Sequence, residues 1–281
     1  MVDLKETNRL LDVLMATVDS PEPVAEGAEL YCGLDVGTAF IVLVVVDAAG
    51  EPVACAYQFA DVVRDGMVVD YMGACDIARS LKEQLEGRLG CELFQTAVAI
   101  PPGTENLDGG VVRNVAESAG FDVVAVFDEP TAANMVMGIE NGAVVDIGGG
   151  TTGISVLCDG RVVQCVDEST GGTHFSLVLA GAKGVGFDEA ESYKRDSANH
   201  AEVLRIVRPT VDKVASIVER SCRGFEVPEV ILVGGTAEIT GIEDRMEHQL
   251  GMPVVKPSRP MFVTPLGIAC GCRAKVQGEG R

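Results

Sequence analysis

Two glycine-rich segments carry aspartate and threonine at matching positions, and this combination of residue types suits phosphate chemistry. The first segment is Gly33–Thr38, with the sequence GLDVGT, and the second is Val145–Thr151, with the sequence VDIGGGT. Because glycine has no side chain, backbone N–H groups in such turns can converge on phosphate oxygens. Threonine hydroxyls add donors, and an aspartate at the end of the preceding strand can hold a metal ion through water. One such turn is common in ordinary hairpins, whereas two equivalent turns predict a bound nucleotide.

The two segments lie in the same local pattern, which indicates an internal duplication. In each copy an apolar strand ends in aspartate, and a glycine-rich turn leads to a second strand, another turn and a third strand. Asp35 in the first copy and Asp146 in the second lie 111 residues apart. Two such meanders, each continued by helices and strands, predict a duplicated α/β protein with two lobes. A nucleotide held between the lobes would contact both turns.

The elements that must position these turns follow from hydrophobic periodicity and turn residues. We expect strands at 30–36, 39–47, 53–59, 93–100, 123–127 and 230–233, and a further strand–hairpin pattern from 143. We expect helices at 73–89, 107–119, 129–138, 173–181, 187–195, 201–223 and 264–274. A third glycine turn, Gly234-Gly235-Thr236, follows the strand at 230–233. Such a turn lets a flat base or a ribose lie close to the backbone.

Residues 1–27 differ from the rest of the chain. Apolar side chains recur there at helical spacing, and an acidic linker with two prolines follows. The apolar positions are Leu10, Leu11, Leu14, Met15 and Val18. Two interpretations stay open, a helix that caps the main body and a tethered tag that binds a partner's helix through its apolar face. We expect a first lobe at 28–139, a second lobe at 140–263, and a C-terminal helix at 264–281 that returns to the first lobe.

Composition and charge exclude several classes of function. The chain has 22 Lys and Arg against 42 Asp and Glu, and this net charge of −20 repels phosphate backbones and anionic lipid surfaces. We therefore expect neither a nucleic acid nor a membrane as a partner. The longest apolar run, 39–46, is far shorter than the roughly 20 residues of a membrane span. No secretory signal is evident and the cysteines are scattered singly, so we expect a cytoplasmic protein.

The three glycine turns, in this order, resemble the phosphate-1, phosphate-2 and adenosine motifs of the actin, sugar kinase and Hsp70 superfamily. The segment Asp128–Ala133, with the sequence DEPTAA, resembles the connecting segment of Hsp70 chaperones. This resemblance covers residues 30 to 270 and implies a duplicated actin-like (ribonuclease H-like) ATPase fold with two lobes around a nucleotide cleft. Segments 61–66, 101–104 and 189–195 resemble a short Hsp70-like branch that is encoded with enzymes of ethanolamine utilization and bacterial microcompartments.

The resemblance also implies roles for single residues. Asp35 and Asp146 match aspartates that arrange water-bound Mg²⁺ beside the phosphates, and Glu129 matches a glutamate that helps to position the attacking water. Glu129 and Asp146 are therefore the expected catalytic residues, with ATP or ADP and Mg²⁺ as cofactors. The expected nucleotide-binding residues are Gly37, Thr38, Gly148, Gly149, Gly150 and Thr151 in the phosphate turns, Gly172 near the ribose, Glu191 and Lys194 beside the adenosine, and Gly234, Gly235 and Thr236 in the adenosine turn.

The chain departs from the Hsp70 pattern at three points. Gly153 stands where those proteins carry a second acidic residue, and Glu238 stands in place of an adenine-stacking arginine. A first-lobe lysine near the γ-phosphate has no evident counterpart, since Lys82 alone lies between residues 40 and 100, within an expected helix. The loss of a carboxylate and a cation weakens catalysis more than binding. Slow or absent ATP hydrolysis is therefore an open alternative.

Two classes of function follow from the resemblance. The first is an ATP-binding, Hsp70-like chaperone or reactivating factor without a peptide-binding domain, located in the cytoplasm or in a bacterial microcompartment. Its partners would be ethanolamine-degrading enzymes or proteins of the microcompartment shell and cargo. The alternative is a catalytically weak nucleotide-binding scaffold or assembly protein of the microcompartment. A sugar kinase is less expected, because 281 residues leave little room for the inserts that build a sugar pocket.

Overall fold

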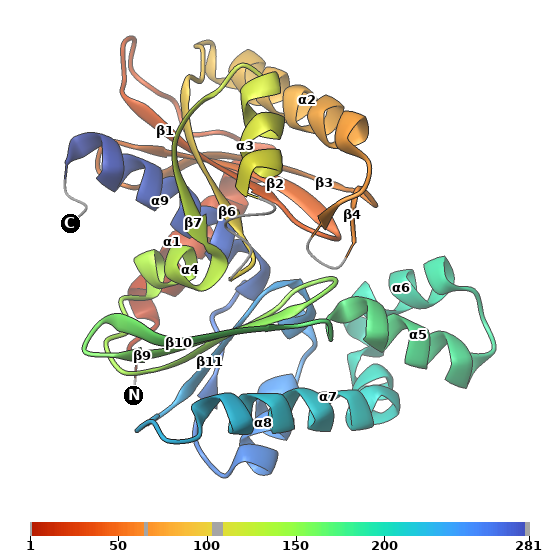
Figure 1. Ribbon diagram of the computed structural model, residues 1–281. Coiled ribbons are helices and arrows are strands. Elements are labelled where there is room, and N and C mark those ends of the chain that lie inside the picture. Colours follow the sequence, from red (N-terminus) through yellow and green to blue (C-terminus); the bar gives the residue numbers. More distant parts are fainter. Residues whose placement is uncertain (1, 65–66, 103–108, 279–281) are drawn as a thin grey trace. The chain divides into compact units, whose positions relative to one another are not determined.

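The computed structural model describes residues 2–64, 67–102 and 109–278 (Figure 1). Parts of the sequence segments 61–66 and 101–104, and the first residues of the helix expected at 107–119, lie outside the described residues. The chain divides into two compact units. We call Val2–Gly138 with Phe262–Arg281 the first lobe, and Ile139–Met261 the second lobe.

The first lobe is built on a sheet with the strand order β3-β2-β1-β6-β7. Its strands are β1 (Leu30–Val36), β2 (Phe40–Asp47), β3 (Pro52–Phe59), β6 (Gln95–Ile100) and β7 (Asp122–Asp128). The first three strands form an antiparallel meander, whereas β6 and β7 run parallel to β1. A short hairpin of β4 (Val63–Arg64) and β5 (Met67–Val68) precedes the first long helix.

Helices cover both faces of this sheet (Figure 1). They are α2 (Tyr71–Leu89) and α3 (Gly109–Ser118) on one face, and α9 (Val263–Gln277) on the other, with α4 (Glu129–Met137) packed against α9. Side chains alternate along β1, so Leu34 joins the core under α2 while Gly33 faces α9. A Cβ at Gly33 would lie 2.7 Å from the carbonyl oxygen of Pro265. Glycine at this position therefore lets α9 lie directly on β1.

The second lobe repeats the same sheet, with the strand order β10-β9-β8-β11-β12. Its strands are β8 (Gly142–Ile147), β9 (Thr152–Cys158), β10 (Arg161–Glu168), β11 (Val230–Val233) and β12 (Val254–Val255). Again three strands form an antiparallel meander and two run parallel to its first strand. The internal duplication expected from Asp35 and Asp146 is therefore confirmed.

The helices of the second lobe follow its sheet in sequence and include one that the sequence analysis did not predict. They are α5 (Gly172–Lys183), α6 (Phe187–Arg195), α7 (His200–Cys222) and α8 (Ile242–Leu250), the last in a stretch to which no element was assigned. The long α7 packs against β9 and β10. Val145 and Ile154 point into this core, so the alternate positions, which include Asp146, lie on the opposite face of the sheet.

The N-terminal helix α1 (Lys5–Asp19) packs against β3 of its own lobe. Leu11 and Leu14 on its apolar face are fully buried. The hydroxyl of Thr7 donates a hydrogen bond to the carbonyl oxygen of Val136 in α4 at 3.2 Å. Of the two interpretations left open for residues 1–27, the structure shows the helix in the capping arrangement. In this arrangement Leu11 and Leu14 are covered by the chain's own first lobe, whereas Leu10, Met15 and Val18 are only partly buried.

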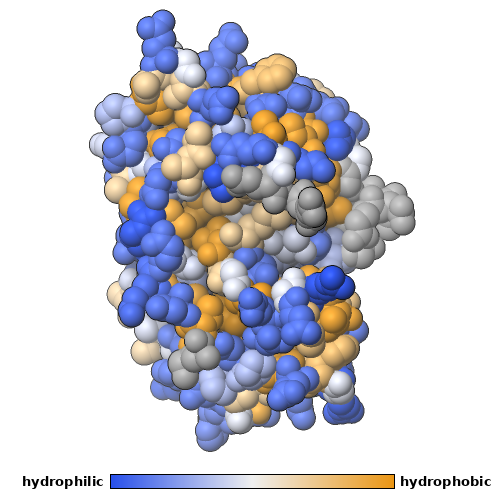
Figure 2. Space-filling view, turned by 90° about the vertical axis from the view of Figure 1, so that its left-hand side faces the viewer, coloured by the Kyte–Doolittle hydropathy of each residue, from blue (hydrophilic) through white to orange (hydrophobic). Residues whose placement is uncertain are grey.

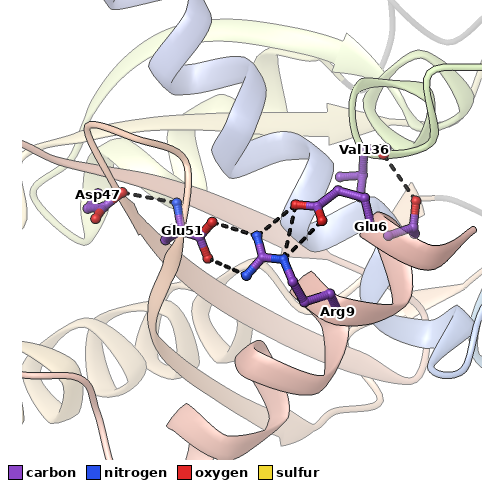
Figure 3. A network of polar contacts seen from close by, with 6 residues as sticks. Glu6, Arg9, Asp47, Glu51 and Val136 are labelled. Carbon is purple, nitrogen blue, oxygen red and sulfur yellow. Dashed lines mark hydrogen bonds and ion pairs between the residues drawn. The ribbon is translucent and has the colours of Figure 1, made fainter.

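An exposed ion-pair network also joins α1 to the turn between β2 and β3 (Figure 3). Arg9 Nη2 donates to Glu6 Oε1 at 2.7 Å and to Glu51 Oε1 at 2.5 Å. Asp47 Oδ1 accepts from the backbone N–H of Glu51 at 2.9 Å and so holds the turn in place. Ion pairs as exposed as these contribute little to stability, because water and salt screen them. The buried leucines therefore contribute most of the free energy that docks α1.

Hydrophilic residues are abundant on the face of the molecule that Figure 2 shows, where they surround smaller apolar patches. Phe59, Met67 and Met72 are among the large apolar side chains that are exposed. Within the described ranges, no helix combines the length and the hydrophobicity needed to cross a membrane.

We expect Leu14→Ala to destabilise the first lobe by about 2–5 kcal/mol, because it leaves a cavity under α1. Urea unfolding followed by circular dichroism measures the change. Asp12→Ala, at an exposed position of the same helix, is the matched control and should change the free energy of unfolding by less than about 0.5 kcal/mol. Equal stabilities of Leu14→Ala and the unaltered protein would contradict the docking of α1.

Candidate functional site

The two glycine turns close with equivalent hydrogen bonds in the two lobes. The backbone N–H of Gly37 donates to the carbonyl oxygen of Phe40 at 3.0 Å, and that of Gly148 donates to the carbonyl oxygen of Thr151 at 3.1 Å. Asp35 and Asp146 each lie two residues before the donor glycine, near the carboxyl ends of β1 and β8. The structure thus gives both turns the same local geometry, as their sequences predict.

The topology of the first lobe brings three of the expected site segments to one edge of the sheet. Because β1, β6 and β7 are parallel, their carboxyl ends lie at the same edge. Asp35 lies near the end of β1, the turn with Gly37 and Thr38 follows that strand, and Glu129 directly follows β7. Glu129 begins α4, whose cap is the side chain of Asp128, which accepts from the N–H of Thr131 at 2.9 Å.

In the second lobe, the phosphate-type turn is attached to the start of α5. The N–H of Gly172 donates to the carbonyl oxygen of Gly148 at 2.9 Å, and the N–H of Thr173 donates to that of Gly149 at 2.7 Å. A Cβ at Gly171 would lie 2.6 Å from the carbonyl carbon of Gly150. Only glycine at position 171 permits this close approach of two backbones.

The adenosine-type turn meets the same phosphate-type turn. It forms the short helix η2 (Gly235–Glu238), and the hydroxyl of Thr236 donates to the carbonyl oxygen of Gly148 at 2.7 Å. Gly234 has a φ of +90°, and a Cβ there would lie 2.6 Å from the carbonyl oxygen of Ile147. The conformation and the lack of space both require glycine at this position.

A buried ion pair completes the cluster. Lys194 Nζ donates to Glu191 Oε2 at 2.8 Å and to the carbonyl oxygen of Gly172 at 3.0 Å. The hydroxyl of Ser176 donates to the same Glu191 oxygen at 2.5 Å. Burial lowers the pKa of Lys194, and the charge of Glu191 opposes that shift. A buried pair is tolerated when both groups are hydrogen-bonded in this way.

Sequence reasoning identified most of this cluster but missed Ser176. Its only signal was its place one helical turn after Gly172, and its hydroxyl also donates to the Gly172 carbonyl oxygen at 3.1 Å. The structure brings together Gly148, Gly172, Glu191, Lys194 and Thr236, which are spread over 88 residues of sequence. Their role in nucleotide binding stays a prediction.

The residues of the cluster fit a phosphate-bearing ligand with a ribose. Glycines at the turns place no side chain between the backbone and a ligand. The hydroxyls of Ser176 and Thr236 and the ammonium group of Lys194 hold the surrounding segments in place through hydrogen bonds. A Cβ at Gly172 would lie 2.5 Å from the Thr236 hydroxyl oxygen and 3.0 Å from Lys194 Nζ, so a side chain there would displace these two groups. Among the described residues, no three His, Cys, Asp or Glu side chains are grouped so as to hold a metal ion directly. The role of Asp35 and Asp146 towards water-bound Mg²⁺ stays a prediction.

Two of the departures noted in the sequence have structural partners. Lys82 Nζ pairs with Glu86 Oε1 at 3.1 Å within α2 and lies over the ring of Phe121. Lys82 therefore serves the packing of α2. Glu238 accepts from the N–H of Met261 at 3.4 Å, and burial raises the pKa of its carboxyl.

Comparison with known proteins places the chain among actin-like and Hsp70-like proteins. The family model for MreB/Mbl protein matches residues 57–179, and that for type IV pilus assembly protein PilM matches residues 123–266. The chain is similar to ethanolamine utilization protein EutJ of Salmonella typhimurium, with 41% identity over 264 residues, 94% of this chain and 93% of the relative. It is also 33% identical to the chaperone protein HscA homolog of Laribacter hongkongensis over 83% of this chain, but spans only 46% of that chaperone.

Solved structures show the same fold. The crystal structure of EutJ from Carboxydothermus hydrogenoformans matches with a TM-score of 0.89 and 46% identity, over 94% of this chain and 98% of that one. MreB5 of Spiroplasma citri, solved bound to ADP, matches with a TM-score of 0.69 and 15% identity over 89% of this chain and 98% of its own. The duplicated actin-like ATPase fold expected from the glycine turns is therefore confirmed.

We expect Lys194→Met to destabilise the second lobe by about 3–5 kcal/mol, because it leaves the buried carboxylate of Glu191 without its buried cation and its nearer partner. The double variant Lys194→Met with Glu191→Gln also removes the charge of the carboxylate, and it should recover part of the lost free energy of unfolding. Arg195→Met removes a more exposed partner of Glu191 at 3.6 Å. As the matched control, it should cost less than about 1 kcal/mol.

Denaturant unfolding of the three variants measures these differences. If Lys194→Met and the double variant unfold at the same denaturant concentration, the two side chains are not coupled.

Proposed function

The chain belongs to the family of the ethanolamine utilization protein EutJ, as its motifs predict, and from this premise we propose that it is a nucleotide-binding, Hsp70-like protein of ethanolamine utilization. The observation that carries the proposal is that two segments of the second lobe donate hydrogen bonds to one carbonyl group. Gly172 and Thr236 both donate to the carbonyl oxygen of Gly148, which holds a phosphate-type turn, a helix start and an adenosine-type turn together. Such an arrangement fixes the backbone of the turn at Gly148–Thr151, and the glycines at 148–150 place no side chain between that backbone and an anion.

The ligand we propose is ATP or ADP with Mg²⁺. Bound Mg²⁺ would neutralise charge on the phosphates. Asp35 and Asp146 would hold the hydrated ion, and Glu129 would position the attacking water. The turns at Gly37–Thr38 and Gly148–Thr151 would bind phosphate oxygens, while Lys194 with Glu191 would hold α6 beside the ribose and the base.

We propose that nucleotide binding changes the grip of this protein on an enzyme of ethanolamine degradation, as in a chaperone or reactivating factor. A two-lobed protein that binds its ligand in one arrangement can transmit binding to a partner. We propose that it is located in the cytoplasm or in the microcompartment, where it would bind shell or cargo proteins. ATP turnover that rises when ethanolamine-degrading enzymes are added would support this function.

A catalytically weak scaffold is the second candidate, and Gly153 and Lys82 favour it. Position 153 offers no side chain, and Lys82 is occupied by Glu86. Both features remove charge that would stabilise the transition state more than the ground state. Tight nucleotide binding with no turnover, unchanged by added enzymes, would select this candidate.

We expect millimolar Mg·ATP or Mg·ADP to raise the melting temperature of the protein, because a ligand that binds only the folded state stabilises it by mass action. At a concentration 100 times the Kd, the gain is about 2.7 kcal/mol. Differential scanning fluorimetry measures it, with Mg²⁺ and inorganic phosphate alone as the control. Melting curves that neither nucleotide moves would refute the proposed function.

We expect Asp146→Ala to weaken Mg²⁺-dependent nucleotide affinity at least tenfold, and Glu129→Ala to change that affinity less than about threefold. The reason is that Asp146 would act on the ion, whereas Glu129 would act on the attacking water and hence on turnover. Isothermal titration calorimetry at two Mg²⁺ concentrations separates the two roles. Equal losses of affinity in both variants would contradict the assignment.

A further inference from the structure

Three residues of the second lobe form a row across neighbouring strands. In the register of β8 with β9, Asp146 lies directly opposite Gly153. In the register of β9 with β10, Gly153 lies directly opposite Asp167. The row therefore reads Asp146, Gly153, Asp167, with the one position that lacks a side chain in the middle.

All three positions lie on the same face of the sheet. Residues directly opposite one another in antiparallel strands project to the same side. The neighbouring residue Ile154 belongs to the core under α7, and Glu168 pairs with Arg220 of α7 at 3.4 Å. Asp146 and Asp167 consequently project from the face opposite to α7. Two strand spacings separate their Cα atoms by about 10 Å.

Asp167 is also linked to the phosphate-type turn. The hydroxyl of Thr151, the last residue of that turn, hydrogen-bonds to the Asp167 carboxylate. The Oδ1 atom of Asp167 is buried and finds no hydrogen-bond partner within the described part of the chain. Burial and the charge of Glu168 raise the pKa of the Asp167 carboxyl, while the Thr151 hydroxyl opposes the rise. In these surroundings a nearby cation would stabilise the ionised form of the carboxylate.

We propose that Asp167 supplies, from β10, the carboxylate that is absent at Gly153, and that it acts with Asp146 on the water-bound Mg²⁺ of the nucleotide. This inference rests on the proposed function. Magnesium keeps several of its waters in such sites and is held by one or two carboxylates together with phosphates. Since Gly153 has no side chain, nothing projects between the two carboxylates in this row.

A purely structural role for Asp167 makes a different prediction. If the side chain served only to hold Thr151, then asparagine, which has the same shape and an amide oxygen, would replace it without effect on Mg²⁺ dependence. If the negative charge matters, asparagine removes the effect of the ion while the fold is kept. Glu168, the next residue, carries the same charge on the opposite face and provides a matched control.

The test compares Asp167→Asn with Glu168→Gln by calorimetric titration of ADP with and without Mg²⁺. We expect Asp167→Asn to lose about 10–100-fold in Mg²⁺-dependent affinity and to keep its affinity without Mg²⁺. Glu168→Gln should match the unaltered protein in both. The melting temperature of ligand-free Asp167→Asn should be unchanged or higher, because the variant removes the charge of a half-buried carboxylate whose Oδ1 finds no partner among the described residues.

A second variant tests the position of the charge. Gly153→Asp combined with Asp167→Asn moves the carboxylate one strand over, within the same row, and should restore Mg²⁺ dependence at least in part. Unchanged Mg²⁺ dependence in Asp167→Asn, or equal losses with and without Mg²⁺, would overturn the inference and leave the proposed function in place. An unaltered protein that binds no ADP would overturn both.

Discussion

The carbonyl oxygen of Gly148 is the point on which the second-lobe site depends. It accepts from the N–H of Gly172 and from the hydroxyl of Thr236, so both of its lone pairs are used. Three segments far apart in the sequence meet at this one atom. To separate any of them would leave a polar group unpaired in a partly buried place, at a cost of about 1–3 kcal/mol. The glycines at positions 171 and 234 follow from this constraint, because a side chain at either would push the segments apart.

The duplicated sheet makes that arrangement possible. In each lobe a meander places an aspartate near the end of the central strand and a glycine turn directly after it, and parallel strands bring further segments to the same edge. Because side chains alternate along a strand, the two faces of each sheet carry different residues. One face of each sheet packs on the helices of its core, with Leu34 and Val145 as examples, while Asp35 and Asp146 belong to the other face. The position of a functional side chain in this fold therefore depends on two things. One is the face of the sheet that the residue occupies, which alternates along the strand, and the other is how close it lies to the carboxyl end of the strand.

The sequence predicts those features that short-range patterns encode. The turns at Gly37 and Gly148 are visible because glycine, aspartate and threonine recur at fixed spacing, and the long helix α7 is visible from its apolar period. The helix α8 was missed because its nine residues are mostly polar, with few buried positions to reveal a period. The docking of α1 could not be decided, since periodicity shows that a face is apolar but not what covers it. Ser176 and Asp167 were missed for a related reason. A hydrogen bond between two helices, or the pairing of residues on neighbouring strands, produces no regular spacing of residue types in the sequence.

The row of Asp146, Gly153 and Asp167 shows how such a register can alter a site without altering a fold. Asp167 lies 14 residues after Gly153 in the sequence, yet the hairpin places the two opposite each other. A carboxylate on β10 reaches the same face as one on β9, and the backbone ladder is identical in either case. A substitution to glycine at one strand position therefore does not by itself remove negative charge from the turn. A comparison of motifs along the sequence finds that an acidic residue is missing at Gly153. A comparison of residues that lie opposite one another in the sheet finds a carboxylate on each side of Gly153, Asp146 on β8 and Asp167 on β10.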